Sequence, residues 1–422
     1  MQFSKTILPN GLRLITVPMK ESPTVTALVL VEAGSKYETK KISGVSHFLE
    51  HLCFKGTEKR PKPIDIVKEL DGIGAQYNAF TGQEMTGYYA KSDKKHFRKI
   101  LDVVSDIYLH STLPSAEMEK EKGVIIEEIK MYQDLPPRRI HDVLLTLLYG
   151  DEPAGWDVAG TPETVRAMTR KDVILYRKKH YVPEATVVAV SGNVSEQEAQ
   201  DAVSNAFSAM QSGAKQGKIT VKEAQKRSAL ALEFRKTDQV HLAFGIRTCD
   251  LYHTDIPALR VATAVLGGGM SSRLFQKMRD ELGICYYVGA SHETFTDHGF
   301  LEITAGVPLN RLEEALRAIL EEVRRLKNGG VSNEELTRAK EYLIGNLYLG
   351  LESSDAVGEF YGFQEIMRKP ILRLDEAIQK IRLVGAEDIA RVCGKYWVDA
   401  RLNLALIGPV KEKREIAKML HL

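Results

Sequence analysis

The chain has 422 residues, which is too long for one compact core, so at least two domains are expected. Its hydrophobic content of 44% and charged content of 27% are typical of a globular protein. The net charge of +2 gives no electrostatic case for binding nucleic acid or an anionic membrane, and no apolar run is long enough to span a bilayer.

Cysteine usage indicates the compartment. The four cysteines are scattered without any CxxC spacing, which argues against a thiolate zinc site and against a disulfide framework. The N-terminal residues lead directly into a strand-like stretch without the pattern of a signal peptide. We therefore expect a cytoplasmic protein. The cysteines are Cys53, Cys249, Cys285 and Cys393.

The first part of the chain predicts strands followed by helices. Pro9-Asn10-Gly11 is a turn signal between two strand-like runs, and the β-branched segment 24–31 predicts a buried strand. A helix of about three turns begins near Gly44 and contains His47 and His51. Further along, we expect a helix at 64–70, strands at 75–79 and 85–90, and helices at 96–110 and 115–132.

The chain repeats itself. The segment from Asp172 to Val194 has a counterpart 216 residues later, from Asp388 to Val410. Ser115 and Ser332 each begin a charged helix, and Ser332 forms a capping box with Glu335. A period this long indicates duplicated domains. We predict an α+β protein of two homologous α/β-sandwich halves, comprising a first domain at 1–210, a Gly/Lys/Gln-rich linker at 211–228 and a second domain at 229–422.

The pentapeptide His47-Phe48-Leu49-Glu50-His51 is the most informative motif. Histidines four residues apart share one face of a helix, and Glu50 lies on that face too. This arrangement is typical of a metal held by two imidazoles beside a carboxylate that takes the proton of an attacking water. The corresponding helix of the second half, at 256–266, contains neither His nor Glu, so the fold itself does not require these residues.

A catalytic zinc usually takes a third protein ligand. The candidates lie in the segment 121–130, where Glu121 and Glu128 are two helical turns apart on one face and Glu127 lies about 100° round from Glu128. The pattern alone does not choose between them.

Several motifs together resemble the M16 (pitrilysin, or inverzincin) metallopeptidases, and in particular the branch of mitochondrial processing peptidases and their bacterial relatives. The match runs along almost the whole chain, and its most specific part is the His-box with its Phe-Lys-Gly-Thr tail. The matching stretches are 10–13, 44–51, 54–57, 78–81, 121–128, 160–163, and Arg279 with Tyr286.

The resemblance implies roles for individual residues. One Zn²⁺ per chain would be held by His47, His51 and Glu128, with Glu127 as the runner-up for the third ligand and Asn346 as the approximate counterpart of Glu128 in the repeat. Glu121 would orient the site, and Glu50 would act as the general base. The strand Asn78-Ala79-Phe80-Thr81 would bind substrate by its exposed edge, and Arg279 and Tyr286 would hold substrate and stabilise the oxyanion.

The resemblance also implies an assembly and an activity. A two-domain chain is half of a clamshell in this branch, so we expect a homodimer or heterodimer in which Arg279 and Tyr286 serve the zinc site of the partner chain. The expected activity is zinc-dependent endopeptidase cleavage of unfolded or short peptides. The alternative is a non-catalytic scaffold or partner subunit, which the intact His-box disfavours. A structural zinc site is disfavoured because no suitable cysteine cluster exists.

Overall fold

A computed structural model describes residues 2–411 and 413–422. The chain forms two compact units, and each is assembled from three separate stretches of sequence. The first unit combines residues up to 130 with 157–219 and 348–374, and the second combines 131–156, 220–347 and 375–422.

The first unit is built on a six-stranded sheet in the order β1-β2-β6-β3-β5-β4. β2 and β6 are parallel and the other neighbouring pairs are antiparallel. The predicted hairpin around Pro9-Asn10-Gly11 and the predicted strand at 24–31 are both present. The bounds are β1 (Ser4–Ile7), β2 (Arg13–Pro18), β3 (Thr24–Val31), β4 (Gln76–Thr81), β5 (Thr86–Asp93) and β6 (Thr186–Gly192).

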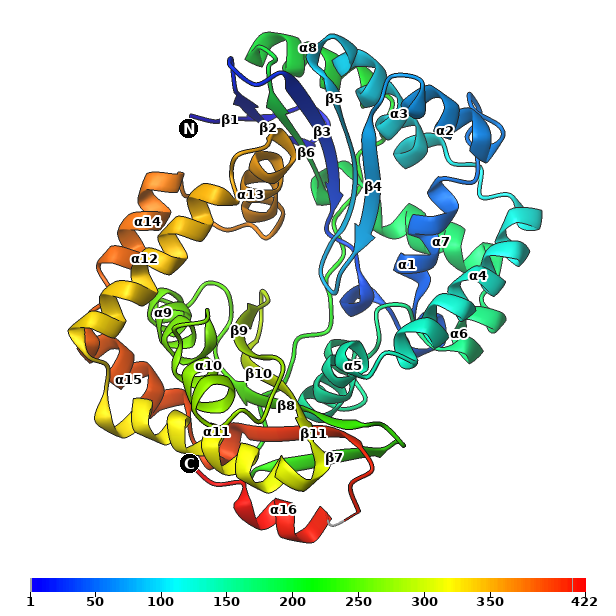
Figure 1. The fold of residues 1–422 in the computed structure, drawn as a ribbon. Coiled ribbons are helices and arrows are strands. Elements are labelled where there is room, and N and C mark those ends of the chain that lie inside the picture. The colour runs from blue at the N-terminus through cyan, green and yellow to red at the C-terminus, as the bar shows by residue number, and fades with distance from the viewer. Residues whose placement is uncertain (1, 412) are drawn as a thin grey trace. The chain divides into compact units, whose positions relative to one another are not determined.

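Helices cover both faces of this sheet. On one face, α3 packs against β3 and β5 and α8 against β2, while on the other α13 packs against β3 and β6, as Figure 1 shows. Each face has its own buried core. The helices are α1 (Val45–Cys53), α2 (Pro63–Asp71), α3 (Phe97–His110), α4 (Ser115–Gln133), α6 (Pro162–Ala167), α7 (Arg170–His180), α8 (Glu196–Ala206) and α13 (Ser354–Ile366).

The second unit repeats this topology. Its five-stranded sheet has the order β7-β11-β8-β10-β9, which matches β2-β6-β3-β5-β4 strand for strand, including the single parallel pair β7–β11. The predicted duplication of an α/β sandwich is therefore present in the fold. The strands are β7 (Ala229–Phe234), β8 (Gln239–Arg247), β9 (Val288–Thr294), β10 (Gly299–Pro308) and β11 (Leu402–Gly408).

The helices of the second unit follow the same plan. α15 and β11 begin 216 positions after α7 and β6, which is the offset found in the sequence repeat. The helices are α5 (Pro136–Tyr149), α9 (Ile256–Gly267), α10 (Arg273–Phe275), α11 (Leu312–Gly329), α12 (Asn333–Leu349), α14 (Leu374–Arg382), α15 (Ala386–Tyr396) and α16 (Lys413–Met419).

Each sequence half contributes one helix to the sheet of the other half. α5, from the first half, packs against β8 and β11, whereas α13, from the second half, packs against β3 and β6. The compact units therefore do not coincide with continuous stretches of sequence. The boundaries at 210 and 229 are inferred from the sequence alone, and they stay a prediction. The segment 211–228 contains no helix or strand. Its residues up to 219 belong to the first unit, and those from 220 onward belong to the second.

None of the described helices combines the length and the apolarity that crossing a bilayer requires.

Candidate metal and active site

The N-terminus of α1 is anchored by a buried carboxylate. Gly44 precedes the helix with a φ of 91°, and a Cβ there would lie 2.4 Å from the Ala159 carbonyl oxygen, so only glycine fits. The Glu38 carboxylate accepts hydrogen bonds from the backbone N–H groups of Gly44 (2.6 Å) and Ser46 (2.8 Å). Burial raises the pKa of Glu38 to about 7, although these hydrogen bonds act in the opposite direction. The helix that carries the His-box is thus fixed where it starts.

Three side chains of the first unit converge on one point. His47 Nε2 lies 3.3 Å from His51 Nε2, and Glu128 Oε2, from α4, lies 3.6 Å from His47 Nε2 and 3.5 Å from His51 Nε2. In tetrahedral zinc with bonds of about 2.0–2.2 Å, ligand atoms stand about 3.3–3.6 Å apart. Within residues 2–411 and 413–422, this is the group of three His, Cys, Asp or Glu side chains that could hold a metal ion. The donor set and the triangle both fit zinc.

The structure separates the two glutamates that spacing left open. Glu127 pairs with Lys130 at 2.7 Å, and 72% of its side chain is exposed. Glu128 instead faces the two histidines. The geometry therefore favours Glu128 as the third ligand.

Glu121 lies behind His51. Its Oε1 is 2.9 Å from His51 Nδ1, and its Oε2 is 2.8 Å from Lys55 Nζ. Burial acts to raise the pKa of this carboxyl, but His51 and Lys55 outweigh that effect and lower it below its ordinary value. Glu121 is thus placed to orient the imidazole, as the resemblance implies.

The two histidines differ in their electrostatics. Burial, with the neighbouring His51, lowers the pKa of His47, which favours a neutral imidazole with a free lone pair. Burial also acts to lower the pKa of His51, but hydrogen bonds with Glu121 and Glu128 raise it above its ordinary value. The cause is the pair of carboxylates on either side of the His51 ring.

Glu50 accepts a hydrogen bond from a residue of β4. Thr81 Oγ1 donates a hydrogen bond of 2.5 Å to Glu50 Oε2. Burial raises the pKa of Glu50 above its ordinary value. A carboxylate with a raised pKa is better suited to accepting a proton near neutral pH.

β4 forms an open edge beside this site. It is the last strand of the sheet and pairs only with β5, so no strand of the sheet lies on its other side. Within β4, the Ala79 N–H donates to Asn78 Oδ1 (2.9 Å). Thr81 contacts Glu50, and Ala79 packs with the core on the α1 side, whereas Phe80 points to the opposite face and lies against Phe363 of α13. Asn78 alternates with Ala79 and lies on the Phe80 face. Of the four predicted substrate residues, two therefore face the site.

Arg279 and Tyr286 belong to the second unit and lie together there. The Arg279 guanidinium is 5.1 Å from the Tyr286 ring centroid, and it also donates a hydrogen bond to the Tyr286 carbonyl. Arg279 lies in a π-helical turn, a rare conformation that is frequent at functional sites, and 76% of Tyr286 is exposed. The predicted pair is therefore assembled and accessible.

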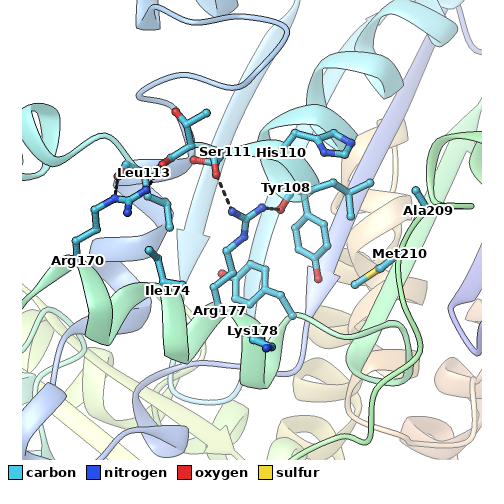
Figure 2. Close-up of a pocket in the computed structure, with 13 residues that line it drawn as sticks. Tyr108, His110, Ser111, Leu113, Arg170, Ile174, Arg177, Lys178, Ala209 and Met210 are labelled. Carbon is cyan, nitrogen blue, oxygen red and sulfur yellow. Dashed lines mark hydrogen bonds between the residues drawn. The ribbon is translucent and has the colours of Figure 1, made fainter.

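A different pocket of the first unit contains no predicted site residue (Figure 2). It encloses about 380 Å³ at the C-terminal end of α3. Arg177 donates to the carbonyls of Tyr108 and Ser111, and Arg170 donates to those of Thr112 and Leu113. These cations satisfy carbonyls in the last turn of α3 and in the segment after it, which is a structural role.

Comparison with known proteins identifies the family. Residues 13–162 match the protein family described as "Insulinase (Peptidase family M16)". Residues 167–343 match the family described as "Peptidase M16 inactive domain". An uncharacterized zinc protease of Bacillus subtilis is 36% identical over 404 residues, covering 95% of this chain and 97% of that protein. The chain belongs to peptidase family M16. An uncharacterized zinc protease of Streptomyces coelicolor is 34% identical over 428 residues, covering 99% of this chain and 91% of the other.

Solved structures show the same fold for this M16 chain. A protease from Helicobacter pylori superposes with a TM-score of 0.90 at 23% identity, and a peptidase M16 inactive domain from Pseudomonas fluorescens with 0.90 at 18%. Each comparison covers 97% of this chain and 99% of the other. The family prediction is confirmed, while the narrower assignment to the processing-peptidase branch stays a prediction.

Three contacts at the site were not foreseen from the sequence. These are Glu38 at the start of α1, Lys55 against Glu121, and the role of Thr81 toward Glu50. Thr81 belongs to the strand predicted to bind substrate, but its hydroxyl donates a hydrogen bond to Glu50. Glu38 had no signal in the sequence, because it lies in an irregular segment and its partners are backbone N–H groups that only folding brings to it.

Proposed function

We propose that the chain is a zinc-dependent endopeptidase that cleaves unfolded or short peptides. The observation that carries this proposal is the triangle of His47, His51 and Glu128, whose donor atoms stand 3.3–3.6 Å apart with Glu50 on the same helix face. Its membership of family M16 and its relatives' description as zinc proteases support the same reading.

Each residue of the site would have a distinct role in hydrolysis. His47, His51 and Glu128 would hold zinc, which supplies a lowered pKa for the attacking water and polarises the scissile carbonyl. Thr81 holds Glu50 by Oε2, so Glu50 takes the proton of the attacking water at Oε1 and delivers it to the leaving amine. Glu121 keeps the His51 ring in place throughout.

The free edge of β4 supports an extended peptide as the substrate. An edge strand offers backbone N–H and C=O groups to any extended chain, which gives broad recognition. A peptide added beside β4 would lie next to Thr81 and hence next to Glu50. We propose that unfolded segments are preferred, because a folded protein has no free strand to add.

We further propose a dimer, as a homodimer or with a related chain, in which Arg279 and Tyr286 serve the zinc site of the partner. Both the metal triad and the Arg279–Tyr286 pair are intact in one sequence, and the pair is assembled within its own unit. The resemblance to processing peptidases supports this arrangement. The four free cysteines support a reducing compartment, and we propose the cytoplasm.

The competing function is that of a non-catalytic scaffold subunit. The "inactive domain" family description matches residues 167–343, which lie outside the His-box. The Pseudomonas fluorescens structure with that title covers 97% of this chain, but at 18% identity it shows the fold alone. The described residues keep the metal triad and its orienting carboxylate together, which favours the peptidase.

The test is cleavage of a labelled unstructured peptide by the purified chain, its Glu50→Gln variant and its Glu58→Gln variant. Glu58 is an exposed glutamate shortly after the His-box and serves as the matched control. We expect Glu50→Gln to lose at least about 100-fold in kcat while retaining zinc, and Glu58→Gln to behave as wild type. Full activity of a zinc-loaded Glu50→Gln chain would refute the proposed mechanism.

A further inference from the structure

The tail of the His-box forms a locked turn. Gly56 has a φ of +126°, and a Cβ there would lie 2.5 Å from the Pro61 carbonyl oxygen, so a side chain is excluded. Thr57 Oγ1 donates to Asp106 (2.6 Å) and accepts from the Arg60 N–H (2.8 Å). The residue before Gly56 is therefore held at a defined position immediately beyond α1.

That residue is Lys55, and it points at Glu121. Its Nζ lies 2.8 Å from Glu121 Oε2, while the other oxygen of the same carboxylate lies 2.9 Å from His51 Nδ1. The Glu121 side chain is 6% exposed and that of Lys55 is 25% exposed. Both oxygens of a nearly buried carboxylate are thus engaged, one by the tail and one by a metal-ligand candidate.

A carboxylate that is held by both oxygens is far more restricted in its orientation than one held by a single oxygen. The terminal torsion of a glutamate is broad, so a carboxylate held only by His51 can rotate about its last bond. With Lys55 on Oε2, the plane of the Glu121 carboxylate is set, and Oε1 is presented to Nδ1 in one direction. The opposite nitrogen of that ring, Nε2, is the atom that belongs to the ligand triangle.

We propose that Lys55 is a positioning residue for the metal site, acting through Glu121 on the orientation of His51. This inference rests on the proposed zinc function and deepens it. Partners outside the ligand set commonly change metal affinity by about 10- to 100-fold. Because Lys55 acts one step further away, we expect an effect at the lower end of that range.

The alternative is that Lys55 only neutralises a buried charge and so contributes to stability. Metal affinity separates the two roles, because a purely stabilising ion pair changes unfolding but leaves the affinity of the folded protein unchanged. Lys59 provides a matched control. It lies in the same segment and pairs at 2.7 Å with Asp102, which is not one of the ligand candidates, and its side chain is 59% exposed.

The experiment measures zinc affinity by competition with a chromophoric chelator. The proteins are wild type, Lys55→Met, Lys55→Arg, Lys59→Met, Glu121→Gln and the double variant Lys55→Met/Glu121→Gln. Unfolding of the metal-free proteins is recorded in parallel. The double variant removes both charges together, so it provides a reading even if Lys55→Met alone folds poorly, with Lys55→Gln as a further substitute.

We expect Lys55→Met to weaken zinc binding about tenfold, Lys55→Arg to stay within about threefold of wild type, and Lys59→Met to be unchanged. The double variant should bind no more weakly than Glu121→Gln, because Lys55 acts through Glu121. Wild-type affinity in folded Lys55→Met, or losses that multiply in the double variant, would overturn the inference. A wild-type chain that binds no zinc would instead refute the proposed function, and the inference with it.

Discussion

At the scale of single residues, the site combines a short local motif with partners that only folding supplies. His47, Glu50 and His51 share a helix face because of their spacing, so the sequence predicts their proximity. Glu128 and Thr81 reach them from α4 and β4. The candidate ligand set and the hydrogen bond to Glu50 are therefore tertiary features, although the pair of histidines is a local one.

Thr81→Val tests the hydrogen bond that holds Glu50. The substitution keeps the size and the β-branched shape of the side chain, and it leaves the backbone edge of β4 available to substrate. We expect kcat for an unstructured peptide to fall about tenfold with KM changed by less than about twofold, because the base loses its fixed orientation. Steady-state kinetics with equal zinc loading provides the measurement.

Thr81→Ser is the matched control, because it retains the hydroxyl, and its kcat should stay within about threefold of wild type. A Thr81→Val enzyme with unchanged kcat, or one that changes only KM, would show that Thr81 does not position Glu50.

Residue-level prediction reached its limit at the choice between Glu127 and Glu128. Neighbouring positions on a helix differ by about 100° in direction, and the spacing from the His-box does not fix the rotation of α4 relative to α1. The structure separates them through the ion pair of Glu127 with Lys130 and the contact of Glu128 with the histidines. The sequence gives Lys55 no role beyond its place in the Phe-Lys-Gly-Thr tail, because its contact with Glu121 joins segments 66 positions apart.

At the scale of elements, the local signals in the sequence predicted the elements well. The capping box proposed for Ser332 and Glu335 is present: the Glu335 N–H donates to Ser332 Oγ (3.2 Å), and the Ser332 N–H donates to Glu335 Oε2 (3.0 Å). β4 extends two residues beyond its predicted end, to Thr81, and α1 begins one residue after Gly44 because that glycine is left-handed.

The exchange of α5 and α13 between the two sheets was not predicted. Helix patterns show which face is apolar, but both sheets present equivalent apolar faces because they are copies of one another. The choice of sheet depends on how the connections run in three dimensions. In a duplicated chain, the helices and strands can therefore be predicted from the sequence, but the sheet against which a given helix packs cannot.

Glu335→Gln tests the start of α12 and its dependence on pH. The ion pair with Arg273 lowers the pKa of Glu335 to about 2, with further hydrogen bonds from Ser332. The unfolded chain therefore binds more protons between pH 4.5 and 2, so this contribution is present above pH 4.5 and is lost as pH falls through that window. We expect Glu335→Gln to lose about 1–2 kcal/mol of unfolding free energy at pH 7, and less as the pH approaches 3.

Urea unfolding followed by circular dichroism at several pH values measures this effect. Glu334→Gln is the control, since Glu334 is the adjacent glutamate, with 86% of its side chain exposed, and should matter by less than about 0.5 kcal/mol. A loss from Glu335→Gln that does not vary between pH 7 and pH 3 would contradict the assignment of the effect to the ionised carboxylate.

At the scale of the whole molecule, the two copies of the fold carry different candidate site residues. Both units share the strand order and the helix plan, yet the metal triad occurs in the first and the Arg279–Tyr286 pair in the second. The helix that matches α1 in the repeat contains neither His nor Glu. Because the repeat keeps the frame without these residues, the fold does not require the His-box for packing, which supports the proposed metal-binding role.

Mixing two inactive chains tests the proposed sharing of sites. One chain carries Glu50→Gln and the other carries Arg279→Ala with Tyr286→Ala. If the pair serves the partner's zinc site, each mixed dimer has one intact site, and random mixing restores about a quarter of wild-type activity. Peptide cleavage measured after the chains have exchanged gives the result. No recovery, with mixed dimers demonstrated to form, would rule out action in trans.

Whether His47, His51 and Glu128 form a zinc site can be measured as the zinc content of purified chains after dialysis against a weak chelator. The comparison is between wild type, Glu128→Gln and Glu127→Gln, which alter adjacent residues with the same chemistry. We predict about one zinc per chain for wild type and Glu127→Gln, and well below one for Glu128→Gln. Full retention of zinc by Glu128→Gln, or the absence of zinc from the wild-type chain, would show that these three residues do not form a zinc site.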